Sequence, residues 1–341
     1  MNTPKLYSQQ NWSFLKEKDP VEVIYPATGP LSKDHMLKIK HIVEEYGLTV
    51  IYDENAFDAQ KSPFHYYAND LEGRLHNVMN ALNGKYGVLW AFRGGYGSVE
   101  VIERLETLGY LPPSKPKIFI GASDITHFHA LAAKWGWISF HAPGIGGARE
   151  GYKFTPHIKI NVHATLKDVV DVLLGKKQTL EYVFDLIHNP ASFSKKNTLF
   201  GSVIGGNATL VKETQGTLTE LNTKNRFVFL EDTKEDPKRL NRVFVSLLRG
   251  GFFDDVKAIL FGSLLIDHAE DEKEAAFKTI NLFIKDHLLP RGIDVPIFYS
   301  PEFGHGDYNH VLPFGTEASL EVKDKVGILK VKTNQSFKEA P

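Results

Sequence analysis

Residues 117–126 read KIFIGASDIT, an apolar run followed by Gly-Ala-Ser-Asp and then by residues with helical spacing. The apolar run is typical of a buried strand, so Ser123 stands between a strand and a helix. A serine in this position either caps the helix, which is worth about 1 kcal/mol, or presents its hydroxyl as a nucleophile beside the N–H groups of a helix start. The residues alone leave both interpretations open, and Ile125 replaces the last glycine of a G-x-S-x-G pattern.

Strand-like and helix-like segments alternate around this stretch. Strands are predicted over 21–27, 48–53, 86–91 and 117–122, and helices over 33–46, 69–83, 98–108 and 125–135. Such alternation predicts an α/β fold with a parallel sheet and right-handed crossovers, of the flavodoxin or Rossmann type. Ligands bind such sheets at the carboxyl ends of the strands, where Ser123 is expected.

The pattern changes after about residue 150. A polar stretch, EGYKFTPHIK, precedes a predicted helix near 165–174, and strands are predicted over 199–207, 226–232 and 256–264, with a helix over 237–249. A loop over 295–315 and a C-terminal β-hairpin follow. We expect a second, mixed β/α domain, similar to a swivelling β-barrel, with domain bounds of 1–165 and 190–341 and a linker over 166–189.

The composition excludes several classes of function. Lys plus Arg number 40 and Asp plus Glu 41, a net charge of −1, so we expect neither a nucleic-acid nor a membrane partner. Cysteine is absent, which excludes disulfides and thiolate chemistry. No run approaches about 18 apolar residues, and the first residues lack an apolar core of signal-peptide length. We therefore expect a cytoplasmic protein.

A glycine-rich loop follows the predicted strand over 86–91. It reads Arg93-Gly94-Gly95-Tyr96-Gly97. Glycines let a backbone approach a ligand closely, and the next helix supplies a positive N-terminus, so the loop suits a carboxylate or an oxyanion. It could instead be a flexible turn, but a turn needs neither the arginine nor the tyrosine. It is not a Walker loop, because no Gly-Lys-Ser/Thr follows.

Two other segments carry groups suited to acid–base chemistry. Glu231 ends the strand RFVFLED, where a carboxylate could orient a histidine or simply mark the return of the chain to water. His305 is flanked by glycines in FGHGD and has a reference pKa suited to a general base. His127, His129 and His141 are competing histidines.

No metal site is predicted. His127 and His129 are two residues apart and point in different directions on a helix, and neither an H-x-x-x-H nor an H-E-x-x-H spacing occurs.

Four segments in order resemble one family. These are RGGYG, GASD with the downstream FHAPG, FLEDTKEDPKRLNR with VKAILFGSL, and FGHGDYNHVLPFG; VIYPATGP and YYANDLEGR are also similar. Together they resemble the LD-carboxypeptidases, serine peptidases that include muramoyltetrapeptide carboxypeptidases and microcin C immunity proteins. The resemblance spans roughly residues 21–315.

The resemblance implies a Ser-His-Glu triad. By position, Ser123 is the nucleophile, His305 the general base, and Glu231 the carboxylate that orients the imidazole. Glu235, four residues on, could replace Glu231 if the alignment slips. Ser123 and the other two residues fall in different predicted domains, so the triad would form only across their interface.

The same resemblance implies the groups that surround the triad. The oxyanion hole matches the backbone N–H of Asp124 and that of Gly94 or Gly95. For substrate binding, Arg93 is the candidate for the terminal carboxylate of a peptide, and Tyr96 is a second candidate. No cofactor is implied, and a homodimer is expected.

The implied activity is hydrolysis of an L,D-peptide bond, which removes the C-terminal D-alanine from muropeptide tetrapeptides in cell-wall recycling. One alternative is the microcin C immunity type, which acts on peptidyl or aminoacyl adenylates. That reading needs an aromatic side chain to stack on adenine, and no tryptophan follows Trp137. A second alternative, from another class, is a non-catalytic module that binds a small anion.

Overall fold

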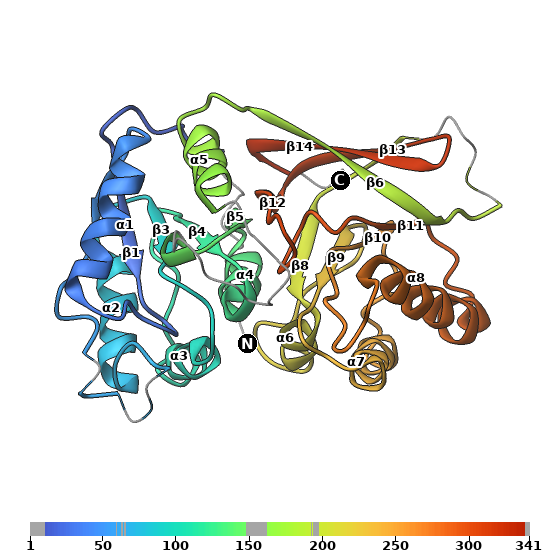
Figure 1. Cartoon of the computed structure of the whole chain (residues 1–341), viewed down its shortest axis with the longest axis horizontal. Coiled ribbons are helices and arrows are strands. Elements are labelled where there is room, and N and C mark those ends of the chain that lie inside the picture. Colours follow the sequence, from blue (N-terminus) through green and yellow to red (C-terminus); the bar gives the residue numbers. More distant parts are fainter. Residues whose placement is uncertain are drawn as a thin grey trace.

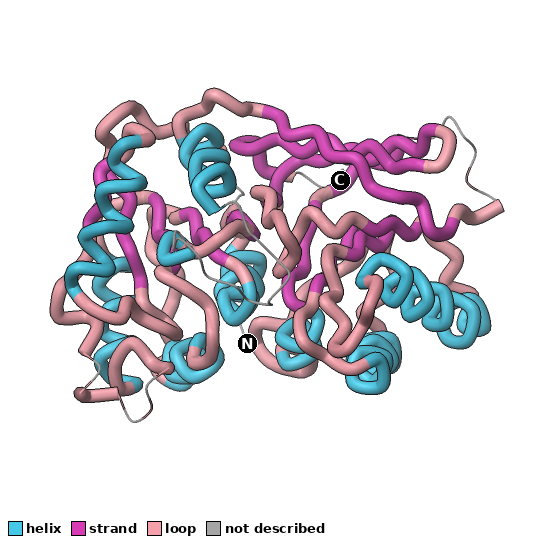
Figure 2. The backbone as a smooth tube through the Cα atoms, in the orientation of Figure 1, coloured by secondary structure: helices cyan, strands magenta, loops and turns pink. Residues whose placement is uncertain are grey.

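The computed structural model describes residues 11–58, 60–62, 64, 66–147, 162–191, 193 and 198–337, except the side chains of 162–165. Two sheets lie side by side, each covered by helices (Figures 1 and 2). The polar stretch EGYKFTPHIK lies outside the described residues.

The elements of the first half alternate between strand and helix, as predicted. They are β1 (Pro20–Ile24), α1 (Lys33–Glu45), β2 (Thr49–Ile51), α2 (Leu71–Asn83), β3 (Val88–Ala91), α3 (Ser98–Thr107), β4 (Ile118–Gly121), the 3₁₀ turn η1 (Ser123–Ile125), α4 (Thr126–Trp135), β5 (Ser139–His141) and η2 (Ile145–Gly147).

Sheet A has the order β12-β5-β4-β3-β1-β2. The five strands from the first half are parallel, and β12 (Leu312–Phe314) joins β5 in antiparallel pairing. This confirms the predicted parallel α/β region. Local sequence explains the helix starts, because Ser32 accepts a hydrogen bond from the His35 N–H and Asp70 accepts one from the Gly73 N–H.

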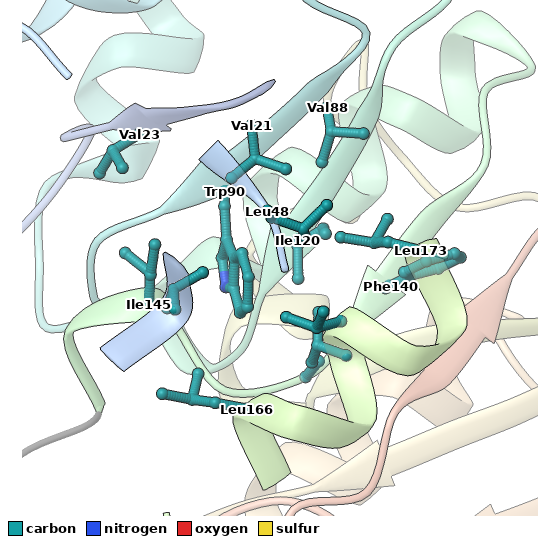
Figure 3. Packing of buried hydrophobic residues seen from close by; sticks show 14 of the residues in the cluster. Val21, Val23, Leu48, Val88, Trp90, Ile120, Phe140, Ile145, Leu166 and Leu173 are labelled. Atoms are coloured by element: carbon teal, nitrogen blue, oxygen red, sulfur yellow. The ribbon is translucent and has the colours of Figure 1, made fainter. Parts of the chain in front are cut away.

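Apolar side chains cover both faces of sheet A. On one face, residues of the strands pack against α1 and α5 (Val162–Leu173), and Figure 3 shows Val21, Trp90, Ile120 and Leu166 within this cluster. On the other face, a separate cluster joins the sheet to α2, α3 and α4. Burial on both faces explains why β3 and β4 are continuous apolar runs.

The second half forms sheet B, with the order β7-β13-β14-β6-β11-β10-β9-β8. Its elements are β6 (Thr179–His188), β7 (Thr198–Gly201), β8 (Val203–Asn207), α6 (Ala208–Glu213), β9 (Phe227–Glu231), α7 (Pro237–Arg249), β10 (Ala258–Phe261), α8 (Glu272–Phe283), η3 (Ile284–Leu288), η4 (Leu289–Arg291), β11 (Ile297–Tyr299), β13 (Thr316–Lys323) and β14 (Val326–Ser336).

Sheet B is mixed, which confirms the predicted class of the second half. Strands β8 to β11 are parallel, whereas β6, β14, β13 and β7 continue the sheet in antiparallel pairs. One face packs against α7 and α8, and the other encloses an apolar cluster rich in phenylalanine, as in a barrel.

Strands β6, β11 and β12 occupy segments that the sequence analysis expected as a linker or a loop. The range 166–189, expected as a linker, contains most of α5 and all of β6, and the expected loop over 295–315 contains β11 and β12. Strands β11 and β12 have three residues each, so tertiary pairing rather than local pattern produces them. The domain bounds themselves stay a prediction.

The two sheets meet at α4 and β8, which Figure 1 places in the middle of the molecule. Thr126, the first residue of α4, accepts a buried hydrogen bond through Oγ1 from the Asn207 N–H at 2.9 Å. Beyond β12, the Gly315 N–H donates to the Val203 carbonyl at 3.1 Å as the chain passes from sheet A into sheet B. These contacts fix the start of α4 relative to the end of β8.

Replacing Thr126 by valine keeps the shape of the side chain and removes this acceptor. The buried Asn207 N–H then loses its partner, so the free energy of unfolding should fall by about 1 to 3 kcal/mol. Urea unfolding of Thr126→Val measures the loss, and Thr126→Ser, which keeps a hydroxyl, is the control. Equal stability of the valine and serine variants would contradict this assignment.

Candidate active site

Ser123 lies on a strained turn between β4 and α4. Its φ is +60°, a conformation that non-glycine residues adopt at a cost of about 1 to 3 kcal/mol. Gly121 allows the turn, because a Cβ there would lie 2.8 Å from side-chain carbons of Ile125. Ser123 is the first residue of η1 and not a capping residue in front of it. No side chain makes a capping hydrogen bond at the start of η1.

The glycine loop after β3 approaches Ser123 closely. A Cβ at Gly94 would lie 2.9 Å from the Ser123 Cβ and 3.1 Å from the Asp124 nitrogen. Gly95 has a φ of +118°, which a side chain would strain. The backbone of the loop and the Asp124 amide thus lie together beside the serine, where the sequence analysis predicted an oxyanion hole.

Two side chains hold this loop: that of Arg74, which the sequence analysis did not single out, and that of Asp124, of which it singled out only the backbone N–H. Arg74 of α2 is buried and donates through Nη1 to the carbonyls of Pro26 and Gly97, and its Nη2 pairs with the Glu100 carboxylate. The carboxylate of Asp124 accepts a hydrogen bond from the Ser98 N–H at 2.8 Å and so caps α3, which has no cap residue of its own. The sequence does contain a signal for Arg74: a charged residue stands at a position where the helical pattern of α2 calls for an apolar one.

Glu231 and His305 form a buried hydrogen-bonded pair. His305 Nδ1 lies 2.6 Å from Glu231 Oε2, and the two side chains are 10% and 0% exposed. Two side chains hold the backbone of the histidine loop: the Ser263 hydroxyl accepts from the His305 N–H, and Asn309 Oδ1 accepts from the Gly304 N–H. The pair directs Nδ1–H of His305 at the carboxylate, so Nε2 is the ring nitrogen that carries the lone pair in the neutral imidazole.

The pair shifts the pKa of both members. Burial alone would raise the pKa of Glu231, but the positive charge of His305 and hydrogen bonds to the carboxylate outweigh burial and hold this pKa below its usual value. Burial alone would lower the pKa of His305, but the Glu231 charge outweighs it and raises this pKa. The charged form of each group therefore stabilises that of the other.

The neighbouring Asp232 has a different role. Successive strand residues point to opposite faces, and the Asp232 carboxylate accepts hydrogen bonds from Asn207 Nδ2 and from the N–H and hydroxyl of Thr209. Burial, together with the Glu231 charge, raises the pKa of Asp232 to about 6. Asp232 thus joins β9 to the start of α6.

The structure separates the competing candidates. The carboxylate that hydrogen-bonds His305 belongs to Glu231 and not to Glu235. His129 is buried between the Ser139 hydroxyl and the Gly121 carbonyl, and burial lowers its pKa to about 3, so it stays neutral. His127 lies 3.6 Å from Glu213 of α6. His141 is buried, with its Nε2 3.8 Å from Glu231 Oε1.

A short series of contacts connects Ser123 with the Glu231–His305 pair. Gly121, two residues before Ser123, pairs in register with His141 of β5. His141 in turn contacts Glu231, which is hydrogen-bonded to His305. The serine of sheet A and the acid–base pair of sheet B therefore belong to the same junction between the sheets.

The two predicted substrate-binding residues lie in the glycine loop. Arg93 is half-buried and forms a β-bridge with Thr28. The Tyr96 side chain is 48% exposed, and its ring lies near those of Tyr66 and Tyr67. Both stay candidates for contact with a substrate.

Two observations on the described residues concern metal ions and lipid bilayers. Within these ranges, no cluster of three or more histidine or acidic side chains is arranged to hold a metal ion. None of the helices in the described part of the chain is both long and apolar enough to cross a lipid bilayer.

Replacing Glu231 by glutamine removes the charge that raises the pKa of His305. Burial then remains as the main influence, so the pKa of His305 should fall below that of the wild type. An NMR titration of the histidine side chains measures this fall. Glu235→Gln is the matched control and should leave His305 unchanged; an equal effect of both substitutions would contradict the pairing.

Comparison with known proteins agrees with this arrangement. Residues 21–142 match the description of the LD-carboxypeptidase N-terminal domain, and residues 200–320 match that of the C-terminal domain. A Rickettsia conorii protein named as a carboxypeptidase is 30% identical over 89% of this chain and 88% of its own length. The murein tetrapeptide carboxypeptidase of Pseudomonas aeruginosa is 26% identical over 94% of this chain and 98% of its own.

Solved structures share the fold. The muramoyltetrapeptide carboxypeptidase of Oxalobacter formigenes has a TM-score of 0.73 and 20% identity and covers 93% of this chain and 100% of its own. The microcin C7 self-immunity protein MccF, in complex with aspartyl sulfamoyl adenosine, has a TM-score of 0.72 and 18% identity and covers 96% and 99%. The chain belongs to the LD-carboxypeptidase family.

Proposed function

We propose that this protein is a serine carboxypeptidase that cleaves an L,D-peptide bond and releases the C-terminal D-alanine of muropeptide tetrapeptides during cell-wall recycling. The observation that carries the proposal is the buried 2.6 Å contact between Glu231 and His305 at the junction that also holds Ser123. The murein tetrapeptide carboxypeptidase of P. aeruginosa, related over nearly the whole chain, supports this substrate class.

The proposed reaction is acyl transfer. Ser123 Oγ attacks the carbonyl carbon of the scissile amide while His305 Nε2 takes the hydroxyl proton. His305 then gives this proton to the nitrogen of the leaving D-alanine, and the shortened peptide stays as an ester on Ser123. Water, deprotonated by the same imidazole, hydrolyses the ester and returns the serine to its starting state.

Each surrounding group has a role in this mechanism. Glu231 keeps the proton on Nδ1 of His305 and stabilises the imidazolium that forms. The N–H groups of Asp124 and of Gly94 or Gly95 stabilise the oxyanion, which the close approach of Gly94 to the Asp124 nitrogen supports.

Binding of the substrate carboxylate is the proposed role of Arg93, because such a charge is costly to bury without a partner. Tyr96 is proposed to contact the peptide beside it. A homodimer and a cytoplasmic location, both expected from the resemblance, stay predictions.

A second candidate is the microcin C immunity type of activity on peptidyl or aminoacyl adenylates. It would use the same triad. Exposed aromatic rings beside the glycine loop favour it: Phe64 and Tyr66 stack with ring centroids 5.4 Å apart, and Tyr96 lies next to Tyr66. Such rings could stack on a nucleobase. The triad does not separate the two activities, and we rank this one second because no tryptophan follows Trp137.

Mass spectrometry of a tetrapeptide and of a peptidyl adenylate, each incubated with the protein, tests the proposal. The wild type should remove one alanine from the tetrapeptide, and Ser123→Ala should not, because it lacks the nucleophile. Cleavage of the adenylate alone would favour the second candidate. Full activity of Ser123→Ala would exclude both, and failure of a serine-directed phosphonate to label Ser123 would support a non-catalytic binding module.

Gly94→Ala tests the proposed oxyanion hole. The added methyl group would lie within 3.1 Å of the Asp124 nitrogen and displace the loop, so kcat/KM should fall by about 100-fold. Gly87→Ala is the matched control, because a Cβ at Gly87 meets nothing within 4 Å. Comparable kcat/KM values for the two variants would argue against an oxyanion hole at Gly94.

A further inference from the structure

His141 lies at the end of β5 and is fully buried. Its ring packs against Phe229 of β9 and Phe314 of β12, with centroids 5.1 Å and 5.9 Å away. A fully buried histidine has two polar nitrogens, and buried polar groups are nearly always hydrogen-bonded. Its side chain extends from sheet A to the position of Glu231 in sheet B.

Both His141 and the nearest carboxylate oxygen lack partners. Within the described ranges, neither ring nitrogen of His141 has a hydrogen bond, and neither has Oε1 of Glu231. His141 Nε2 and Glu231 Oε1 face each other at 3.8 Å. This is about 1 Å longer than an N–H···O hydrogen bond, so a small rotation of either side chain closes it. Leaving both groups unpaired in a buried site would cost more than this rotation.

The other buried histidine nearby cannot take this role. His129, whose ring centroid is 5.9 Å from that of His141, is already bound by the Ser139 hydroxyl and the Gly121 carbonyl. The second oxygen of the Glu231 carboxylate, Oε2, is bound to His305. His141 is therefore the donor positioned for Oε1.

We propose that His141 is a positioning residue for the acid–base pair: its Nε2–H donates to Oε1 of Glu231 and so directs Oε2 at His305. The inference rests on the proposed function and adds a residue to it. A donor on Oε1 prevents rotation of the carboxylate and draws off part of its negative charge. The orientation of a carboxylate in sheet B thus depends on an imidazole from sheet A.

The surrounding charges determine the direction of the pH effect. The carboxylate of Glu231 contacts His305 and His141, and the neighbouring Asp232 acts electrostatically on both members of the pair. Lys234 acts on His305 in the opposite sense. Removal of the His141 N–H leaves more negative charge on Glu231. The protonated form of His305 should therefore persist to a higher pH.

The test compares His141→Phe, which keeps a ring and removes the donor, with His141→Gln, which places an amide N–H near the position of Nε2. In His141→Phe, the acid limb of the kcat/KM profile should move to higher pH, and kcat/KM above this limb should fall on the order of tenfold. His141→Gln should recover most of both. A purely structural role predicts lower thermal stability with no movement of the acid limb, and that result would overturn the proposal.

His129→Gln is the matched control from the same buried cluster, and its acid limb should coincide with that of the wild type. A second measurement needs neither a substitution nor a substrate, so it tests the proposal even where a variant does not fold. In this measurement, ¹⁵N NMR of the wild-type protein should show His141 as the Nε2–H tautomer. An Nδ1–H tautomer would overturn the inference. Failure of the proposed function can be told apart from failure of this inference, because it would appear as undiminished hydrolysis by Ser123→Ala.

Discussion

The hydrogen bond between Glu231 and His305 depends on the packing of sheet B, because Glu231 ends β9 and His305 lies in the loop after β11. A carboxylate with no exposed surface is costly to bury, and only a cationic or donating partner at short distance offsets that cost. The histidine comes from a loop more than seventy positions away, and the hydroxyl of Ser263 and the amide of Asn309 hold that loop. The geometry of the pair thus depends on how β9, β10 and the loop after β11 lie side by side.

The Ser123 side of the candidate site follows a different physical rule. Ser123 is in a conformation that is costly for a serine, and it persists because β4 and α4 on either side are anchored. Gly121 and Gly94 supply the space that this turn needs. Strain of this kind places a serine at the carboxyl edge of a parallel sheet, close to the Asp124 nitrogen and the Gly94 backbone.

Each half of the site uses two neighbouring residues for two purposes. In Ser123-Asp124, the serine begins the strained turn and the aspartate caps α3; in Glu231-Asp232, the glutamate is hydrogen-bonded to His305 and the aspartate joins β9 to α6. Residues of the candidate site and residues that hold the framework therefore alternate along the sequence. A substitution in either aspartate would disturb the residue beside it.

The sequence by itself determined the alternation of strands and helices in the first half and the positions of Ser123, Glu231 and His305 as candidates, because periodicity and short motifs are local properties of the chain. It could not determine β12, whose three residues are a strand only because β5 lies beside them. Nor could it show that Arg74 holds the glycine loop, or that His141 faces Glu231. These contacts depend on tertiary packing and not on local pattern: the packing of α2 against the glycine loop for Arg74, and that of sheet A against sheet B for His141 and Glu231.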